Sequence, residues 1–298
     1  MPGLSPTRTG VLMGLGAYSL WGVLPLYLKA LLPLSPVDIL SYRVLWSLLL
    51  LLLIALVYRR IAAARDALRR PRVAIALLAT TALVAANWLL YIHAVNTGHA
   101  LQASLGYFIN PLVNVLLGVV FLRERLGWAE AVAVLLAAAG VAALTIEQGG
   151  LPMMPLALAL TFSLYGLVRK MIGIAPVEGL LIETSLIAPL ALAWLLFAST
   201  PPPAAAGPLP SLPLLALGGV MTTVPLLLFN GAARRIRYSE LGLLQYIGPT
   251  IALLIAIYVF GEPLLPIHIL TFGLIWTGLI VYAAATWHRG RITPALPE

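Results

Sequence analysis

Two ionisable residues, Arg43 and Glu183, lie inside long apolar stretches of the sequence. A charged side chain within a bilayer is costly unless it is paired or hydrated, so each of the two requires a physical reason. They could form an ion pair with each other, and such a pair would fix how two helices pack. Alternatively, Glu183 could face a water-filled cavity and take up a proton in a coupling cycle. The sequence leaves both interpretations open.

Polar and aromatic side chains also recur at helical spacing within apolar stretches. In segment 104–125, Tyr107, Pro111 and Asn114 share one face of the expected helix because they are four and three residues apart. Polar groups at membrane depth must be satisfied by protein or by a water-filled cavity. We therefore expect a solute-binding set that consists of Trp21, Asn87, Trp88, Tyr91, Tyr107, Asn110, Asn114, Tyr165, Gln245 and Tyr246. The alternative is that small and polar residues only hold the helices together.

Sequence patterns for enzymatic or metal chemistry are missing. The chain has no cysteine, so it has neither a disulfide nor a thiolate metal site. His93 and His99 are six residues apart, which is not a same-face metal spacing. HExxH, GxSxG and P-loop motifs are absent, and the glycines at Gly14 and Gly16 lack the third glycine of a dinucleotide turn. We expect no catalytic activity, no cofactor and no metal site.

The composition places these residues in a membrane. The 298 residues are 61% hydrophobic and 9% charged, with a mean hydropathy of +1.02, whereas soluble domains are about 25% charged. The net charge is +8, but the basic residues lie in short loops between apolar segments, so we expect no nucleic-acid partner. The expected partners are membrane lipid and a small-molecule solute. The sequence does not indicate the oligomeric state.

Ten segments are long and apolar enough to cross a bilayer as helices, which takes about 20 residues each. They are 9–29, 36–57, 72–94, 100–121, 127–146, 152–171, 177–199, 211–233, 239–260 and 266–287. If both termini are cytoplasmic, sixteen of the eighteen Lys and Arg residues fall on the cytoplasmic side. Basic residues are retained in cytoplasmic loops, so we predict an all-α membrane protein with both ends in the cytoplasm.

The sequence also contains an internal repeat. Residues 104–125 align without a gap with residues 242–263, and five positions are identical, among them Pro111 with Pro249. Similarly, the SLWG motif that contains Trp21 corresponds to the SLYG motif that contains Tyr165. Each repeat holds five crossings, so the second copy, 149–298, would enter the membrane from the side opposite to the first, 1–148. Such an inverted repeat is typical of secondary transporters, and prolines in matching spans predict helix bends at a site between the halves.

Several motifs resemble those of the EamA-type transporters of the drug/metabolite transporter superfamily and, within it, of the RarD branch. The resemblance covers nearly the whole chain. Its most specific parts are ASLGYFINPLVN at 103–114, QYIGPT at 245–250, NWLL at 87–90, YGLVRK at 165–170, LIET at 181–184 and TTVPLL at 222–227. It implies a ten-helix bacterial inner-membrane protein that moves small metabolites or drugs outward. It also implies that Arg43 and Glu183 are residues that the family shares.

These observations lead to one expected function and two alternatives. We expect a secondary active transporter that exports a small amphipathic metabolite or drug by alternating access. The first alternative is a proton-coupled drug or metabolite antiporter. The second is a non-transporting membrane receptor or accessory protein that uses the same fold.

Overall fold

The computed structural model describes residues 6–122, 127–200, 208–233, 235–236 and 244–292, and all regular elements in these residues are helices. The expected all-α fold is therefore confirmed for this part of the chain. The elements are α1 (Pro6–Ala30), α2 (Pro36–Val57), α3 (Ile61–Leu68), α4 (Pro71–Asn96), α5 (Ala100–Leu122), α6 (Trp128–Gln148), α7 (Met153–Ile172), α8 (Pro176–Ala193), the π-helix η1 (Trp194–Ala198), α9 (Leu212–Ala233), α11 (Ile247–Tyr258) and α12 (Pro266–Ile292).

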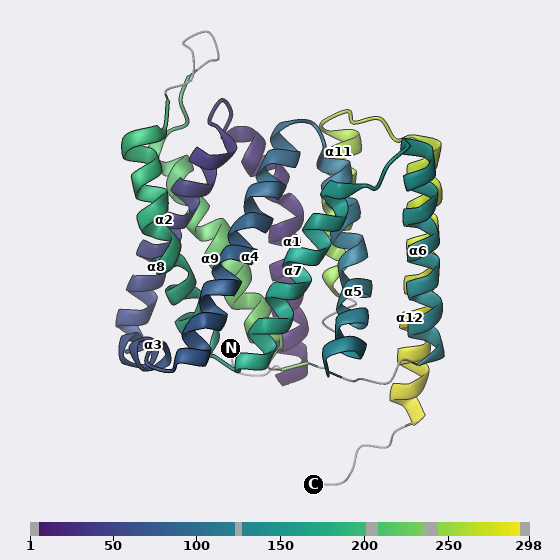
Figure 1. Cartoon of the computed structure of the whole chain (residues 1–298), viewed down its shortest axis with the longest axis horizontal. Coiled ribbons are helices and arrows are strands. Elements are labelled where there is room, and N and C mark those ends of the chain that lie inside the picture. The colour runs from purple at the N-terminus through teal and green to yellow at the C-terminus, as the bar shows by residue number, and fades with distance from the viewer. Residues whose placement is uncertain (1–5, 123–126, 201–207, 234, 237–243, 293–298) are drawn as a thin grey trace.

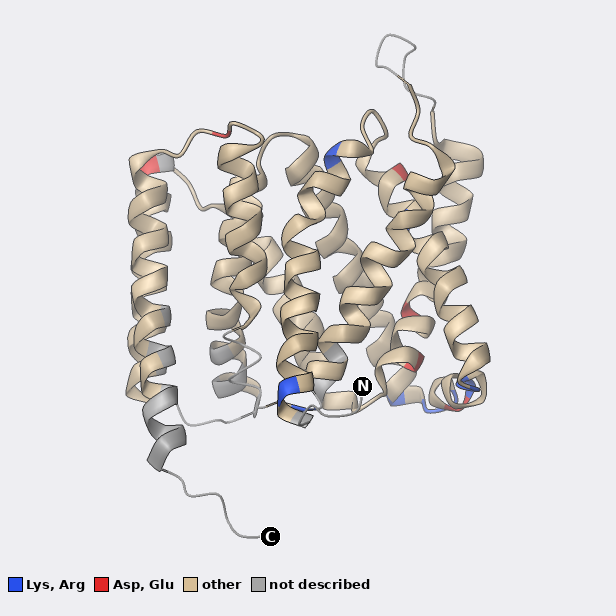
Figure 2. Cartoon of the chain, turned by 180° about the vertical axis from the view of Figure 1, so that it is seen from behind, with Lys and Arg blue, Asp and Glu red and all other residues tan. Residues whose placement is uncertain are grey.

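The long helices lie side by side and run between the same two ends of the molecule (Figure 1). Helix α1 begins, and helix α12 ends, at one of these ends, where most of the described Lys and Arg residues also gather (Figure 2). Within the described residues, five helical segments are long and apolar enough to cross a membrane, judged by length and composition: Thr7–Ala30, Pro36–Val57, Pro71–Asn96, Pro176–Ala198 and Leu212–Phe229.

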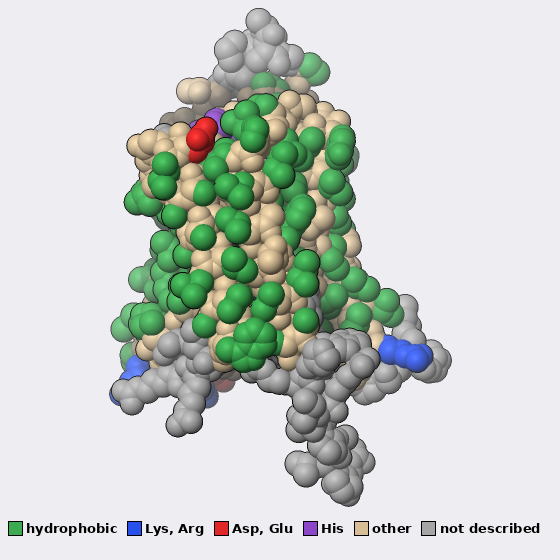
Figure 3. Space-filling view, turned by 90° about the vertical axis from the view of Figure 1, so that its right-hand side faces the viewer, with side chains coloured by type: hydrophobic (Ala, Val, Ile, Leu, Met, Phe, Trp, Pro, Cys, Tyr) green, Lys and Arg blue, Asp and Glu red, His purple; other side chains and the backbone are tan. Residues whose placement is uncertain are grey.

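The flank formed by α6 and α12 presents hydrophobic side chains over most of its height, with charged side chains only toward its ends (Figure 3). Leu135 on α6 is 67% exposed and Ile280 on α12 is 68% exposed. Apolar surface of this extent is unfavourable in water but suits contact with lipid chains. The outer surface of these two helices therefore agrees with a membrane environment.

Helix α2 begins at a capping box. The hydroxyl oxygen of Ser35 accepts a hydrogen bond from the backbone N–H of Asp38 (3.1 Å), and the Asp38 carboxylate accepts one from the backbone N–H of Ser35 (3.2 Å). Pro36 occupies the first helical position, where its missing N–H costs nothing. The indole N–H of Trp194 also donates to Asp38 (2.8 Å). The Asp38 side chain therefore caps the N-terminus of α2 and also connects it to η1, which directly follows α8.

Helix α3 is an element that the sequence did not predict, because the arginine-rich segment 59–72 was expected to be a loop. The helix lies across the end of the bundle where α1 begins (Figure 1). Its residues Ala64 and Ala67 are buried in a cluster with Leu51 and Leu180, while Arg65 is exposed. The two alanines are three residues apart and therefore lie on one face of the helix. Their apolar contacts on this face hold α3 against the bundle.

The most extensive helix–helix contacts all join a helix before Gly149 to a helix after it. These pairs are α6–α12, α5–α7, α2–α9, α1–α9, α2–α8, α4–α7 and α1–α11. Gly106 permits the close approach of α5 to α7, since a Cβ atom there would lie 2.8 Å from the carbonyl oxygen of Pro155. The two parts of the chain therefore interlock along their whole length, and the centre of the molecule is bounded by helices from both.

Candidate solute-binding site

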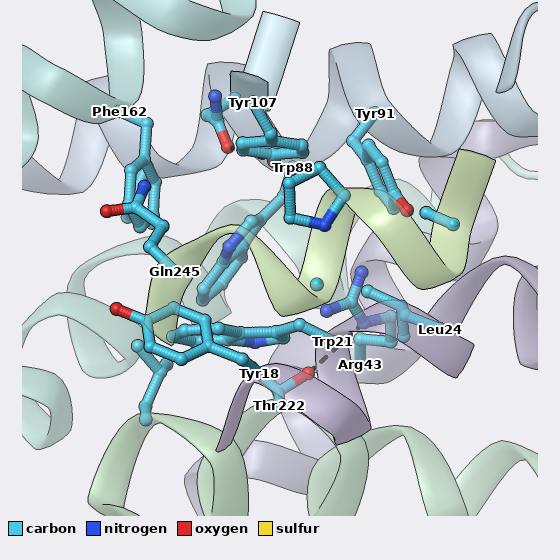
Figure 4. A pocket seen from close by; sticks show the side chains of 16 residues that line it. Tyr18, Trp21, Leu24, Arg43, Trp88, Tyr91, Tyr107, Phe162, Thr222 and Gln245 are labelled. Carbon is cyan, nitrogen blue, oxygen red and sulfur yellow. Dashed lines mark hydrogen bonds between the residues drawn. The ribbon is translucent and has the colours of Figure 1, made fainter. Parts of the chain in front are cut away.

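A cavity of about 80 Å³ lies at the centre of the bundle, between helices of both parts of the chain (Figure 4). One ordered water needs at least about 10 Å³ of such space, so the cavity has room for several waters or part of a small solute. Its described lining residues are Tyr18, Trp21 and Leu24 of α1, Arg43 of α2, Val84, Asn87, Trp88 and Tyr91 of α4, Tyr107 of α5, Phe162 of α7, Thr222 and Leu226 of α9, Gln245, and Gly248, Pro249 and Ala252 of α11.

Six of the sixteen described lining residues are aromatic. Tyr91 and Tyr107 meet edge to face with ring centroids 5.4 Å apart, and Tyr107 meets Phe162 in the same way at 6.0 Å. On the other side Tyr18 and Trp21 lie 5.6 Å apart. Edge-to-face contact is a favourable arrangement of two aromatic rings, so the contacts of Tyr107 stabilise the orientation of its ring in the wall. An apolar or aromatic solute body suits such a lining.

Arg43 supplies the positive charge of the cavity. Its side chain comes from α2 and points into the cavity (Figure 4), although the residue is only 3% exposed. Nε donates a hydrogen bond to Oγ1 of Thr222 (3.1 Å), and the guanidinium carbon lies 5.6 Å from the ring centroid of Trp88. Nη1 is buried and has no hydrogen-bond partner among the described residues. The guanidinium is therefore held in position but not neutralised.

Asn87 lines the cavity, but its amide is already occupied. Nδ2 donates to the carbonyl oxygen of Leu158 (2.9 Å) and to Oγ1 of Thr161 (2.9 Å), and Oδ1 accepts a hydrogen bond from the Tyr107 hydroxyl (2.9 Å). These bonds join α4, α5 and α7. Asn87 therefore positions the Tyr107 ring and ties three helices together.

Four residues of the expected binding set lie outside the cavity lining. Asn110 is buried, and its side-chain oxygen accepts a hydrogen bond from Ser163 on α7. Asn114 is half-buried further along α5. The ring of Tyr246 stacks on Phe108 at 6.2 Å, and the fourth residue, Tyr165, points to Glu183 as described below. The contact of these residues with a solute stays a prediction.

Glu183 is buried and belongs to a second polar cluster. Its Oε1 lies 3.7 Å from Nε of Arg169 and accepts a hydrogen bond from Thr80 (2.7 Å), while Oε2 accepts one from the Tyr165 hydroxyl (3.4 Å). The proposed ion pair between Arg43 and Glu183 is therefore wrong for this structure. Helices α2 and α8 do pack together, but the Glu183 carboxylate is held by α4 and α7, whereas Arg43 is held by α9.

The two prolines of the repeat occupy different local structures. Pro111 lies inside the continuous helix α5, where its predicted bend stays a prediction. Pro249 is the third residue of α11, which begins after a turn at Tyr246. In a first helical turn the missing N–H removes no intrahelical hydrogen bond. The second proline therefore lies close to an irregular turn at Tyr246 near the cavity, and the helix bend predicted there stays a prediction.

The cavity also contains residues that the sequence analysis did not select. Phe162 is the repeat counterpart of Tyr18, because the motifs SLWG and SLYG follow them directly, and both line the cavity. Applying the repeat to Tyr18 would have found Phe162. Thr222 begins the TTVPLL motif, but that motif did not indicate the hydrogen bond from Arg43 on another helix.

Comparisons with known proteins agree with this architecture. A profile of the EamA-like transporter family matches residues 8–146 and again residues 150–284. An uncharacterized transporter of Pseudomonas aeruginosa is 43% identical over 96% of this chain and 97% of its own length. Protein RarD of Escherichia coli K12 is 41% identical over 96% of this chain and 98% of its own length. A protein crystal structure with 20% identity superposes with a TM-score of 0.62 over 96% of this chain and 99% of its own, which supports the fold alone.

These likenesses extend over nearly the full chain and therefore concern the whole bundle. The apolar helices and the lipid-compatible flank of α6 and α12 agree with a multi-pass membrane protein. The expected resemblance is thereby confirmed: this chain is a RarD-type member of the EamA-like transporter family.

Proposed function

We propose that the protein is a secondary active transporter that exports a small amphipathic metabolite or drug by alternating access. The observation that carries this proposal is the central cavity, whose lining comes from α1, α2, α4 and α5 on one side of Gly149 and from α7, α9 and α11 on the other. A cavity at the interface between two halves can open to either side of a membrane when the halves rock against each other.

The helix packing supports a duplicated, inverted architecture with units 1–148 and 149–298. Suppose that α1, α2, α4, α5 and α6 correspond to α7, α8, α9, α11 and α12. Under this correspondence, the contacting pair α1–α9 matches the pair α4–α7, the pair α5–α7 matches α1–α11, and the pair α2–α9 matches α4–α8. The pairs α2–α8 and α6–α12 each match themselves. All of these pairs are present. Together with the two family matches, this symmetry favours ten crossings in two five-helix repeats.

The charge distribution supports the orientation. The beginning of α1 and the end of α12 lie at the end of the bundle where Lys and Arg gather (Figure 2). Lys29 lies at the opposite end of α1. By the positive-inside rule we place both termini in the cytoplasm and the protein in the bacterial inner membrane. The loop arginines Arg123, Arg125, Arg234 and Arg237, which the sequence argument also used, lie outside the described residues.

Proton-coupled antiport remains the alternative mechanism, and the buried Glu183 carboxylate favours it. Glu183 is held by one cation and two hydroxyl groups, so its protonation would remove the ion pair that joins α7 to α8. Acidic residues inside membrane spans serve as proton relays in pumps and transporters.

Solute flux tests the proposal. The purified full chain is reconstituted into liposomes and exposed to a broad panel of metabolites, amino acids and amphenicols, with and without a pH gradient. We expect saturable, protein-dependent movement of at least one compound, compared with protein-free liposomes. If no compound moves under either condition, the receptor or accessory role on the same fold is favoured instead.

A further inference from the structure

The cavity contains one buried cation and no buried anion among its described lining residues. From this we propose that the transported solute carries a carboxylate group, which binds to the guanidinium of Arg43. The inference rests on the proposed transport function and narrows the class of solute.

Arg43 has no negatively charged partner among the described residues. A buried guanidinium is costly without a negative partner. The ion pairs of the described residues are Arg60–Glu178, Arg69–Asp66 and Arg169–Glu183, and none of them includes Arg43. Its contacts are the neutral hydroxyl of Thr222 and the face of Trp88. A ligand that brings its own negative charge into the cavity therefore removes an electrostatic penalty, which a neutral ligand cannot do.

The second argument is geometric. Arg43 uses Nε for Thr222, while Nη1 is buried without a partner. The Arg43 stem is confined by Gly218 on α9, where an added Cβ would lie 2.9 Å from Arg43 Cγ. The guanidinium is therefore fixed before binding, and it faces the cavity (Figure 4). A carboxylate suits such a donor, because guanidinium–carboxylate hydrogen bonds are charge-assisted and short.

The third argument concerns the rest of the solute. Apart from Arg43, Thr222 and the amides of Asn87 and Gln245, the cavity is lined mainly by aromatic and aliphatic side chains, among them Trp21, Tyr91 and Tyr107. An aromatic wall alone would also suit an organic cation. The fixed charge of Arg43 opposes that class by repulsion, and selectivity often depends on such a repulsive element. The favoured solute is thus an amphipathic acid with an apolar body.

A matched set of ligands tests this inference on the wild-type protein. Isothermal titration calorimetry on the purified full chain compares 3-phenylpropanoate, 3-phenylpropanamide and 3-phenylpropan-1-amine, and then the corresponding acid, amide and amine with indolyl and hexyl bodies. We expect the acid to bind roughly 10- to 100-fold more tightly than its amide, as one charge-assisted hydrogen bond predicts. Amides or amines that bind as tightly as the acids, or a panel in which no acid binds, overturn the inference.

Variants of Arg43 test whether this residue causes the preference for the acid over the amide. Arg43→Gln should bind acid and amide with equal affinity, and Arg43→Lys should keep part of the preference for the acid. Arg69→Gln is the matched control, since Arg69 is exposed on the end of α3 and pairs with Asp66. An acid preference that persists in Arg43→Gln contradicts the assignment. If that variant does not fold, the comparison of ligands on the wild-type protein and on Arg43→Lys still decides the question.

The inference and the transport proposal can fail separately. Saturable flux of neutral or cationic solutes, unchanged by Arg43→Lys, would keep the transport function and reject the anionic solute. Tight binding of acids without flux of any compound would keep the Arg43 site and reject transport.

Discussion

Arg169 on α7 lies 3.7 Å from Glu183 on α8, measured from Nε to Oε1, and their side chains are 12% and 2% exposed. The pair lies between consecutive helices of the second half. Its negative charge is further held by hydroxyl groups of Thr80 on α4 and Tyr165 on α7. One carboxylate therefore joins three helices, away from the cavity lined by Arg43.

Breaking this pair should destabilise the protein. Neutralising one partner leaves a buried charge alone, which costs on the order of 3 kcal/mol. We expect Arg169→Gln and Glu183→Gln each to lower the melting temperature in detergent, and the double variant to recover part of the loss. The control is a double-mutant cycle of Arg43→Gln with Glu183→Gln. Their effects on the free energy of unfolding should be additive, because Arg43 contacts other residues. A coupled Arg43–Glu183 cycle, or an additive Arg169–Glu183 cycle, would contradict the observed pairing.

Glu183 is the residue at which proton coupling of transport can be tested. If it exchanges the coupling proton, Glu183→Gln should transport without any dependence on the pH gradient, because the amide cannot ionise. The measurement is flux into proteoliposomes with the internal pH held fixed and the external pH varied, beside wild-type protein. A variant that folds and keeps the wild-type dependence shows that Glu183 acts only in the structure.

The two asparagines on α4 and α5 should differ in effect. Asn87→Leu leaves the Tyr107 hydroxyl without its hydrogen-bond acceptor, and an unsatisfied buried polar group costs about 1–3 kcal/mol. We expect a clear loss of thermal stability and weaker ligand binding. Asn114→Leu is the control, because Asn114 is absent from the cavity lining and half-buried. Impaired flux in Asn114→Leu with normal stability would instead confirm the prediction from the sequence that Asn114 contacts the solute.

The contact of α5 with α7 depends on the missing side chain at Gly106. A Cβ there would lie 2.8 Å from the Pro155 carbonyl oxygen and 3.0 Å from Leu158 Cβ, so Gly106→Ala should force the helices apart at a cost of about 1–3 kcal/mol. Gly166 on α7 has no atom within 4 Å of its Cβ position. Gly166→Ala should therefore be neutral or stabilising, by up to about 1 kcal/mol from helix propensity. Melting curves of the two variants check the difference; equal effects would argue against close approach at Gly106.

The sequence predicted the helical architecture and much of the cavity, for reasons that can be named. Apolar runs bounded by Pro and Gly mark helices, and Trp21, Trp88 and Tyr107 stood out as aromatic residues near the middle of such runs. All three line the cavity, and for Tyr107 this agrees with the need of a polar hydroxyl at membrane depth for an interior partner.

The contacts between side chains of different helices depend on which helices become neighbours. A single sequence does not show which helices these are. Glu183 pairs with Arg169. From the sequence, Arg169 was only one of the basic residues near helix ends that indicate the orientation in the membrane. Thr222 became relevant through its contact with Arg43 from a different helix. Asn110 and Tyr246 follow the helical pattern but turn toward Ser163 and Phe108. Helical periodicity assigns a face, but it does not say what that face meets.

The central claim is that the cavity between the two halves is the transport site. Ala252 on α11 lines it and is 4% exposed, whereas Leu254, two residues further along, is 48% exposed. Saturable counterflow into proteoliposomes is measured for wild-type protein, Ala252→Phe and Leu254→Phe, with melting temperatures recorded in parallel. We expect wild-type flux in Leu254→Phe and loss of flux in a folded Ala252→Phe, because the added ring fills the cavity. Equal flux in both variants would contradict it.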